Sequence, residues 1–233
     1  MRKIKLNSFS PEAAAIYRDF KQRPGSGHIA KPVTIEALLQ LIQKLQPRRI
    51  LEMGGGIGAI SYTLLKHSKA RVDVYEDSEF CREQLRQALR EFTDRYQIIE
   101  DYRVLPPARE YDLVIVDGGS GRSGDGGFRE AVWLYLNYIQ DVKAVYVEGN
   151  RHIQRLLARR ALRHRFIYRL IAYADAEFDG EVVHGGLLMK TRKSESRLLR
   201  WLCFAYWELV EWKAIRNALL YRLQKVKKLF KIR

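Results

Sequence analysis

Three glycines at alternate positions in a short turn are the clearest chemical feature of this 233-residue chain. They stand in Glu52-Met53-Gly54-Gly55-Gly56-Ile57-Gly58, between a hydrophobic segment at 49–52 and an apolar segment at 59–66. Because glycine has no Cβ atom, a ligand can lie against bare peptide groups at the start of the following helix. The pattern therefore predicts a strand, a tight turn and a helix that together bind a nucleotide-type cofactor.

Carboxylates follow each of the hydrophobic segments that we expect to be strands. In a parallel sheet, ligands bind beyond the carboxyl ends of the strands, at the point where the strand order reverses. A carboxylate after the second strand can accept both hydroxyl hydrogens of a ribose. One beside the glycine turn can hold an ammonium group through ordered water or backbone. The acids at these strand ends are Glu52, Glu76, Glu100, Asp101, Asp117 and Glu148.

The elements that must position these residues alternate along the chain. Strands are expected at 49–52, 71–76, 97–100, 111–117 and 142–147. Helices are expected at 11–20, 33–45, 59–66, 78–92, 128–139 and 152–163. This alternation predicts an α/β fold with a doubly wound, mainly parallel sheet. Two further strands, at 166–174 and 182–191, are joined by a short acidic turn and must be antiparallel, which makes a seven-stranded sheet with an antiparallel last strand.

The residues at these strand ends resemble those of the class I S-adenosylmethionine-dependent methyltransferases, over roughly residues 25–192. The shared features are Glu-x-Gly-x-Gly-x-Gly at 52–58, the acid Glu76 after the second strand, and Asp117-Gly118 after the fourth. The pattern is closest to small-molecule O-methyltransferases of the catechol and caffeoyl-CoA type, whose first strand reads Leu-Glu-x-Gly and whose fourth reads Val-Asp-Gly. The resemblance implies a Rossmann-like transferase (EC 2.1.1.-) that uses S-adenosylmethionine (SAM).

The resemblance also implies which residues contact the cofactor. The three glycines would line the methionine part of SAM, Glu76 would hold the ribose, and Asp101 with Tyr102 would flank the adenine. The positions carried over in this way are Glu52, Gly54, Gly56, Gly58, Glu76, Asp101, Tyr102 and Asp117.

Metal-dependent members of this family hold a divalent cation with an Asp after the fourth strand and an Asp-Asn pair after the fifth. Asp117 matches the first position. Glu148-Gly149-Asn150 differs from the second, because a glycine separates the acid from the amide. Asp117, Glu148 and Asn150 offer the oxygen ligands that Mg²⁺ takes, but the altered spacing argues against the site. A Mg²⁺ cofactor therefore stays an open alternative.

Methyl transfer from a sulfonium mainly requires in-line positioning and removal of a proton from the acceptor hydroxyl. Asp117 is the first candidate for the base, and His28, in a Gly-rich loop that could fold over the cofactor, is the second. Asn150 and Arg151 follow the fifth strand and are candidate substrate contacts, since Arg151 could hold an anionic group. We expect the acceptor to be a small molecule or a glycan.

Three regions are expected along the chain. Residues 1–46 would form an N-terminal helical segment and a lid, 47–192 the SAM-binding domain, and 193–233 a basic amphipathic helical tail. Hydrophobic residues make up 47% of the sequence, which excludes wholesale disorder. The two cysteines, Cys81 and Cys203, indicate no disulfide framework or zinc site. The first residues contain no apolar run of signal-peptide length, so we expect a cytoplasmic protein.

Positive charge is concentrated in the tail. The chain carries a net charge of +15, and residues 190–233 hold 13 basic and three acidic residues, or 13 − 3 = +10. Apolar residues recur there at three- and four-residue spacing, which predicts an amphipathic helix. A basic helix with tryptophans suits an anionic surface, such as the inner face of the cell membrane. Packing on the domain, or self-association through 196–233, is the alternative.

Other functions fit parts of this pattern. The charge would suit an RNA-modifying methyltransferase, although the sequence contains no Asn-Pro-Pro-Tyr motif and no recognisable RNA-binding module. Aminopropyl transferases also have a Gly-Gly-Gly turn and a Val-Asp pair after the fourth strand. A non-catalytic, methyltransferase-like scaffold at a membrane or in an oligomer is the alternative from a different class.

Overall fold

The computed structural model of this protein describes residues 2–4, 9–118 and 128–212. Its centre is an eight-stranded sheet in the order β1-β7-β10-β6-β5-β2-β3-β4. The parallel central strands are β2 (Arg49–Met53), β3 (Arg71–Tyr75), β4 (Tyr96–Ile99), β5 (Glu110–Val116) and β6 (Asp141–Val147). The chain adds β3 and β4 on one side of β2 and then β5 and β6 on the other. The strand order therefore reverses at β2, as in other doubly wound sheets.

One strand inside the sheet runs antiparallel to both of its neighbours. β10 (Leu187–Lys193) lies between β6 and β7 (Phe166–Tyr173) and is antiparallel to both. The predicted doubly wound sheet with an antiparallel last strand is thus confirmed. All seven expected strands are present, and β1 (Arg2–Ile4) adds a short eighth strand parallel to β7. Three residues are too few to show a strand period in the sequence.

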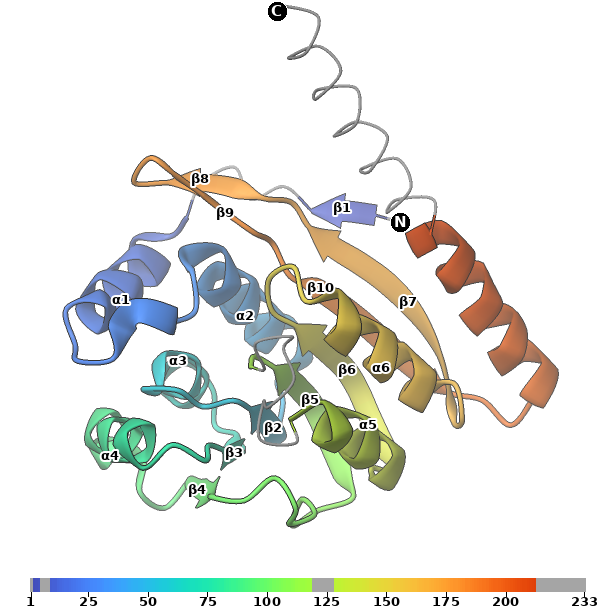
Figure 1. The fold of residues 1–233 in the computed structure, drawn as a ribbon, viewed down its shortest axis with the longest axis horizontal. Coiled ribbons are helices and arrows are strands. Elements are labelled where there is room, and N and C mark those ends of the chain that lie inside the picture. Colours follow the sequence, from blue (N-terminus) through green and yellow to red (C-terminus); the bar gives the residue numbers. More distant parts are fainter. Residues whose placement is uncertain (1, 5–8, 119–127, 213–233) are drawn as a thin grey trace, which may run out of the picture.

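The expected strand 182–191 is interrupted. β8 (Ala176–Phe178) and β9 (Glu181–Val183) form a separate antiparallel hairpin, which projects from the sheet toward the first helices (Figure 1). The two residues between them have positive φ, as a two-residue hairpin turn requires. Gly185 then separates β9 from β10. A Cβ atom there would lie 2.1 Å from a carbonyl oxygen of β7, so only glycine allows this close passage.

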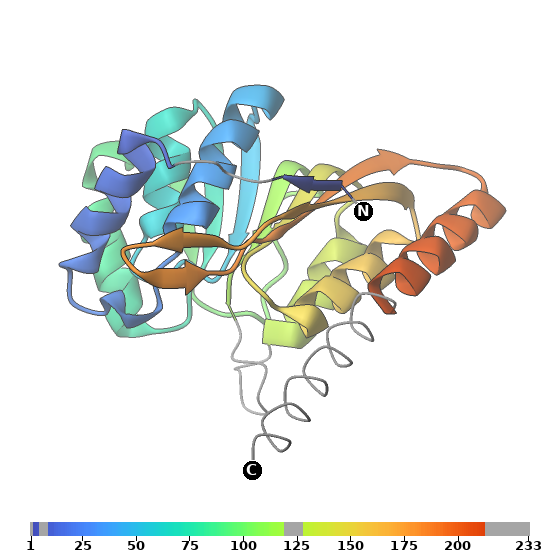
Figure 2. The same ribbon diagram turned by 90° about the horizontal axis from the view of Figure 1, so that it is seen from above.

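Helices cover both faces of the sheet (Figure 2). The first face carries α1 (Pro11–Lys21), α2 (Pro32–Leu45), α3 (Ala59–His67) and α4 (Glu79–Ala88). The second carries α5 (Phe128–Tyr138) and α6 (His152–Leu162), while η1 (Ser26–His28) and η2 (Arg90–Phe92) are short 3-10 turns.

A further helix, here called the tail helix, spans residues 197–212 and packs beside α6 (Figure 1). It forms the first part of the predicted amphipathic tail. The rest of that tail, 213–233, lies outside the described residues. Across the described part of the chain, no helix combines the length and the apolar character needed to cross a membrane.

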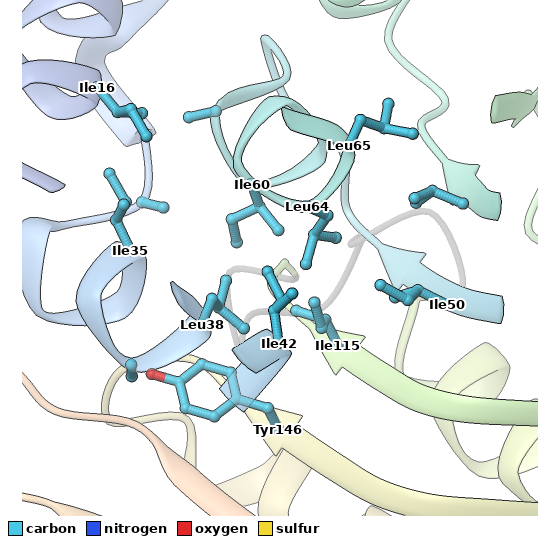
Figure 3. Close-up of a cluster of buried hydrophobic side chains, with 14 of the residues drawn as sticks. Ile16, Ile35, Leu38, Ile42, Ile50, Ile60, Leu64, Leu65, Ile115 and Tyr146 are labelled. Carbon is cyan, nitrogen blue, oxygen red and sulfur yellow. The ribbon is translucent and has the colours of Figure 1, made fainter. Parts of the chain in front are cut away.

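Buried side chains form one core on each face of the sheet. Side chains of a strand alternate between faces, so neighbouring residues enter different cores. Ile50 and Ile115 join the core beneath α2 and α3, which Figure 3 shows, whereas Leu51 and Val114 join the core beneath α5 and α6. All four are fully buried, and each such side chain contributes about 1.5–3 kcal/mol. This burial fixes β2 and β5, and with them the loops that follow.

Candidate active site

A cleft of about 410 Å³ opens at the carboxyl ends of β2, β3 and β5. This is the edge where the strand order reverses and where the sequence predicts a ligand. The cleft is large enough for a small-molecule ligand. Of the predicted site residues, it is lined by Gly54, Gly56, Glu76, Tyr102, Asp117, His28 and Arg151, and not by Glu52, Gly58, Asp101, Glu148 or Asn150.

The three glycines at alternate positions of the turn differ in their structural surroundings. Gly54 has φ +91°, and a Cβ atom there would lie 1.7 Å from the carbonyl oxygen of Asp117, so glycine lets the end of β2 pack against the end of β5. Gly58, with φ +94°, precedes α3 and does not line the cleft. Gly56 has φ +50°, and a Cβ atom there would meet no atom of the described residues within 4 Å. Gly56 is thus the glycine that leaves bare backbone facing open space in the cleft.

Glu76 follows β3 and lies directly beside this bare backbone. Its Oε2 accepts a hydrogen bond from the Gly56 amide at 2.7 Å, and its Oε1 accepts one from the Ser78 amide at 2.9 Å. Burial raises the pKa of Glu76, and these two hydrogen bonds act in the opposite direction. Each carboxylate oxygen keeps a second lone pair. Glu76 can therefore still accept hydroxyl hydrogens from a ligand in the cleft.

Glu52 lies beneath the turn rather than in the cleft. Its side chain is fully buried, and its Oε2 accepts a hydrogen bond from the Ser61 hydroxyl of α3 at 2.5 Å. Burial raises the pKa of Glu52 well above its ordinary range. In this position Glu52 ties β2 to α3. A link to an ammonium group in the cleft would have to pass through the backbone or a water molecule.

Of the two residues expected to flank the adenine, Tyr102 lines the cleft and Asp101 does not. Tyr102 is buried, lines the cleft and stacks on Tyr75 with ring centroids 5.6 Å apart. The Tyr135 hydroxyl donates a hydrogen bond to the Tyr102 carbonyl oxygen at 2.5 Å, which fixes the backbone there. Asp101 instead points to a neighbouring hollow and pairs with Arg103 at 2.9 Å. Tyr102 is the member of the pair that a ligand in this cleft can reach.

Arg151 contacts two acids that follow β5 and β6. Its Nη2 lies 2.8 Å from Asp117 Oδ1 and 3.3 Å from Glu148 Oε2. The two acids are neighbours because they directly follow the paired strands β5 and β6. Thr34 of α2 donates its hydroxyl to Glu148 Oε1 at 3.1 Å. One guanidinium thus neutralises part of the charge of two nearly buried carboxylates.

The environment of Asp117 raises the pKa of its carboxyl group toward neutral pH. Burial raises the pKa of Asp117 to about 7, and the negative charge of Glu148 acts in the same direction. Arg151 lowers the pKa but does not outweigh these two effects. A carboxyl group with a pKa near 7 is suited to exchange protons at neutral pH.

The predicted metal ligands do not fit a divalent cation in this arrangement. The guanidinium of Arg151 lies between Asp117 and Glu148, where a shared cation would have to bind. Asn150 is exposed and does not line the cleft. No group of three or more His, Cys, Asp or Glu side chains that could hold a metal occurs among the described residues. The structure therefore does not support the Mg²⁺ alternative.

The second candidate base enters the cleft from the N-terminal region. His28 ends η1, is exposed, and lines the cleft together with Gly25, Ile29 and Ala30. Sequence patterns did not identify the apolar wall that Phe128 contributes from α5, nor the hydrogen bond from Thr34. Phe128 carries no motif. Thr34 stands 114 positions from its partner in the chain, so only the fold brings the two together.

Solved structures share the fold of this protein. An O-methyltransferase from Bacillus cereus in complex with SAH has a TM-score of 0.56 at 13% identity, covering 80% of this chain and 93% of that one. TomG from Streptomyces achromogenes, an O-methyltransferase solved with SAM, has a TM-score of 0.53 at 18% identity, covering 77% and 87%. The fold is that of the class I SAM-dependent methyltransferases.

A third structure with this methyltransferase fold comes from Pyrococcus horikoshii, where the protein is proposed to be an RNA methyltransferase. It has a TM-score of 0.58 at 16% identity, covering 79% of this chain and 99% of that one. No protein-family model and no curated protein sequence matches the chain. At these identities the likeness concerns the methyltransferase fold and not the acceptor.

Proposed function

We propose that this protein is a SAM-dependent methyltransferase that transfers a methyl group to an oxygen atom of a small-molecule or glycan-type acceptor. The observation that carries the proposal is the bare Gly56 backbone beside Glu76, in a cleft at the reversal point of a methyltransferase fold. Structures with this fold have been solved with SAM and with SAH.

The residues present fit this cofactor. The main chain of Gly54 to Gly56 would run along its methionine part, Glu76 would accept the ribose hydroxyls, and Tyr102 would lie against the adenine. Three acidic side chains line the cleft, namely Glu76, Asp77 and Asp117. The positive charge of Arg151 is already paired with two carboxylates. This excess of negative charge suits a cationic sulfonium.

Bound SAM supplies an activated methyl group, so the protein has to position the acceptor and remove its proton. We propose that a carboxylate oxygen of Asp117 accepts the proton of the acceptor hydroxyl, because Asp117 lines the cleft and its pKa lies near 7. Arg151 holds that carboxylate in place through its 2.8 Å contact. His28, which also lines the cleft, is the alternative base.

Calorimetry with SAM and with SAH tests the proposal on the full-length protein. We expect both to bind, and Glu76→Ala to weaken SAH binding about tenfold to a hundredfold, because hydrogen bonds to a charged group contribute about 1.5–3 kcal/mol. Glu79→Ala, an exposed acid in the first turn of α4, is the matched control and should bind normally. Absence of any binding heat in folded protein would refute the proposed function.

RNA is the second candidate acceptor. The net charge of +15 and the P. horikoshii structure favour it. Methyl transfer to RNA but not to small hydroxyl compounds, with RNA binding that falls steeply as salt rises, would decide for this alternative. SAM binding without transfer to any acceptor class, together with loss of cellular function on deletion of the tail, would instead indicate a non-catalytic scaffold.

A further inference from the structure

The tail helix packs on the domain through one side. Trp207 is buried and donates from its indole Nε1 to the Tyr168 carbonyl oxygen at 2.8 Å. Arg159 of α6 pairs with Glu208 at 2.7 Å and with Glu211 at 3.3 Å. These contacts fix the helix against β7 and α6. They also pair two of the three acidic side chains in residues 190–212, which leaves Glu195 as the remaining acid there.

The other side of the tail helix exposes large apolar side chains. Seven of them have exposed fractions between 48% and 66%: Leu198, Leu199, Trp201, Leu202, Tyr206, Leu209 and Trp212. They make up half of the 14 large hydrophobic side chains that are exposed among the described residues. Exposed apolar residues gathered on one element mark an interaction surface, whereas scattered ones do not.

Cations lie next to this apolar surface. A groove of about 420 Å³ between the tail helix and the sheet is lined by Leu199 and Leu202 and by Arg169, Lys190 and Arg192. In the pairing of β10 with β7, Lys190 lies opposite Arg169. Arg192 is two residues further along, so the three cations share one face of the sheet. Within the described part of the chain, none of the three forms an ion pair.

We propose that this face of the protein, the tail helix with the basic groove beside it, binds the surface of an anionic lipid bilayer. Exposed tryptophan, tyrosine and leucine side chains enter the boundary between headgroups and acyl chains, and adjacent cations meet lipid phosphates. In the sequence, residues 213–233 continue from the tail helix with eight basic residues and no acid, which adds charge of the same sign.

Other occupants account for less of this surface. A second copy of the chain would bring two positively charged surfaces together, which is unfavourable. A nucleic acid would engage the cations but would leave the seven apolar side chains in water. An anionic bilayer satisfies both the apolar and the basic side chains. This inference is independent of the proposed enzymatic function.

Co-sedimentation of the full-length protein with vesicles tests the proposal. We expect binding to vesicles of phosphatidylcholine mixed with phosphatidylglycerol, weaker binding to phosphatidylcholine alone, and a blue shift of tryptophan fluorescence on binding. Trp201→Ala/Trp212→Ala should reduce binding at least tenfold. Trp133→Ala is the matched control, since this tryptophan of α5 is 44% exposed but lies outside the tail helix, and it should bind as the wild type does.

A second variant tests the basic groove. Arg169→Gln/Lys190→Gln/Arg192→Gln should weaken binding on the order of a hundredfold, because each cation near an anionic surface contributes about 1 kcal/mol. All substituted side chains are exposed, so unchanged unfolding temperatures should verify the fold. Equal binding to neutral and anionic vesicles, or no effect of either variant, would overturn the proposal. A lipid-free dimer that the double tryptophan variant abolishes would also overturn it, because a second copy would then cover this face.

Discussion

Arg151 and Asp117, which both line the cleft, form an ion pair with Nη2 and Oδ1 2.8 Å apart. The same guanidinium also reaches Glu148 at 3.3 Å, so a side-chain cation occupies the space between two carboxylates at the ends of β5 and β6. In the metal-dependent enzymes that the sequence resembles, this is the region of the divalent cation. Here the charge compensation comes from the chain itself, and it is covalently fixed to the start of α6.

Arg151→Met would remove this compensation and leave Asp117 and Glu148 as two nearly buried acids. We expect the free energy of unfolding to fall by about 1–3 kcal/mol at neutral pH, because buried polar groups would lose their partner. Arg160→Met, at an exposed arginine of the same helix, is the control and should change stability by less than about 0.5 kcal/mol. Urea titrations measure both. Equal stabilities of the two variants would contradict the structural role of Arg151.

The same variant tests the relation to metal binding. With the guanidinium removed, two carboxylates are left that a divalent cation can approach. We expect Mn²⁺ to raise the unfolding temperature of Arg151→Met and not that of the wild type. A Mn²⁺-dependent shift in the wild type would show that a metal can bind beside Arg151.

Gly54 and Gly56 should respond differently to the same substitution. Gly54→Ala would place a Cβ atom 1.7 Å from the Asp117 carbonyl oxygen, so the ends of β2 and β5 must separate. We expect little folded protein. Gly56→Ala has open space and carries mainly the left-handed backbone cost of about 1–2 kcal/mol. Circular dichroism and calorimetry should show that Gly56→Ala is folded but binds SAH weakly. Normal SAH binding by Gly56→Ala would show that the ligand does not lie against this turn.

Asp117 should make stability depend on pH. Its pKa is raised from 3.8 to about 7 in the folded protein, so the folded state binds the proton more tightly than the unfolded chain does. The resulting stabilisation is fully present below about pH 3.8 and is lost as the pH rises through about 7. It amounts to at most about 4 kcal/mol, since Glu148 shares the site. Asp117→Asn should remove this dependence in denaturation curves between pH 4 and 8. Parallel curves for the two proteins would show that Asp117 titrates normally.

Trp207 and Trp201 of the tail helix form a matched pair for testing how the helix is attached. Trp207 is 9% exposed and bonded to β7, whereas Trp201 is 60% exposed. Trp207→Ala should cost about 3 kcal/mol and make the tail helix sensitive to limited proteolysis, because a large buried side chain is lost. Trp201→Ala should leave both stability and protease resistance nearly unchanged. Similar proteolysis of both variants would mean that Trp207 does not anchor the helix.

The order of strands and helices could be predicted because it is a local property. The apolar periods of segments such as 49–52 and 111–117 identified the strands, and alternation with helices required a parallel sheet. The β1 edge strand and the β8–β9 hairpin were not predicted. Three-residue strands show no period, and the partner of β1, strand β7, lies far away in the chain.

The sequence by itself determined the glycine turn and the acids at the strand ends, because parallel strands bring their carboxyl ends to one edge whatever the detailed packing. Only the tertiary structure decided what those residues do. It placed Glu52 beneath the turn and, of the three alternate turn glycines, left only Gly56 with no described atom near an added Cβ. It also set Arg151 between two carboxylates and brought Glu208 and Glu211 to Arg159. Such contacts join residues distant in the chain, so they depend on how helices and strands pack and not on any local pattern.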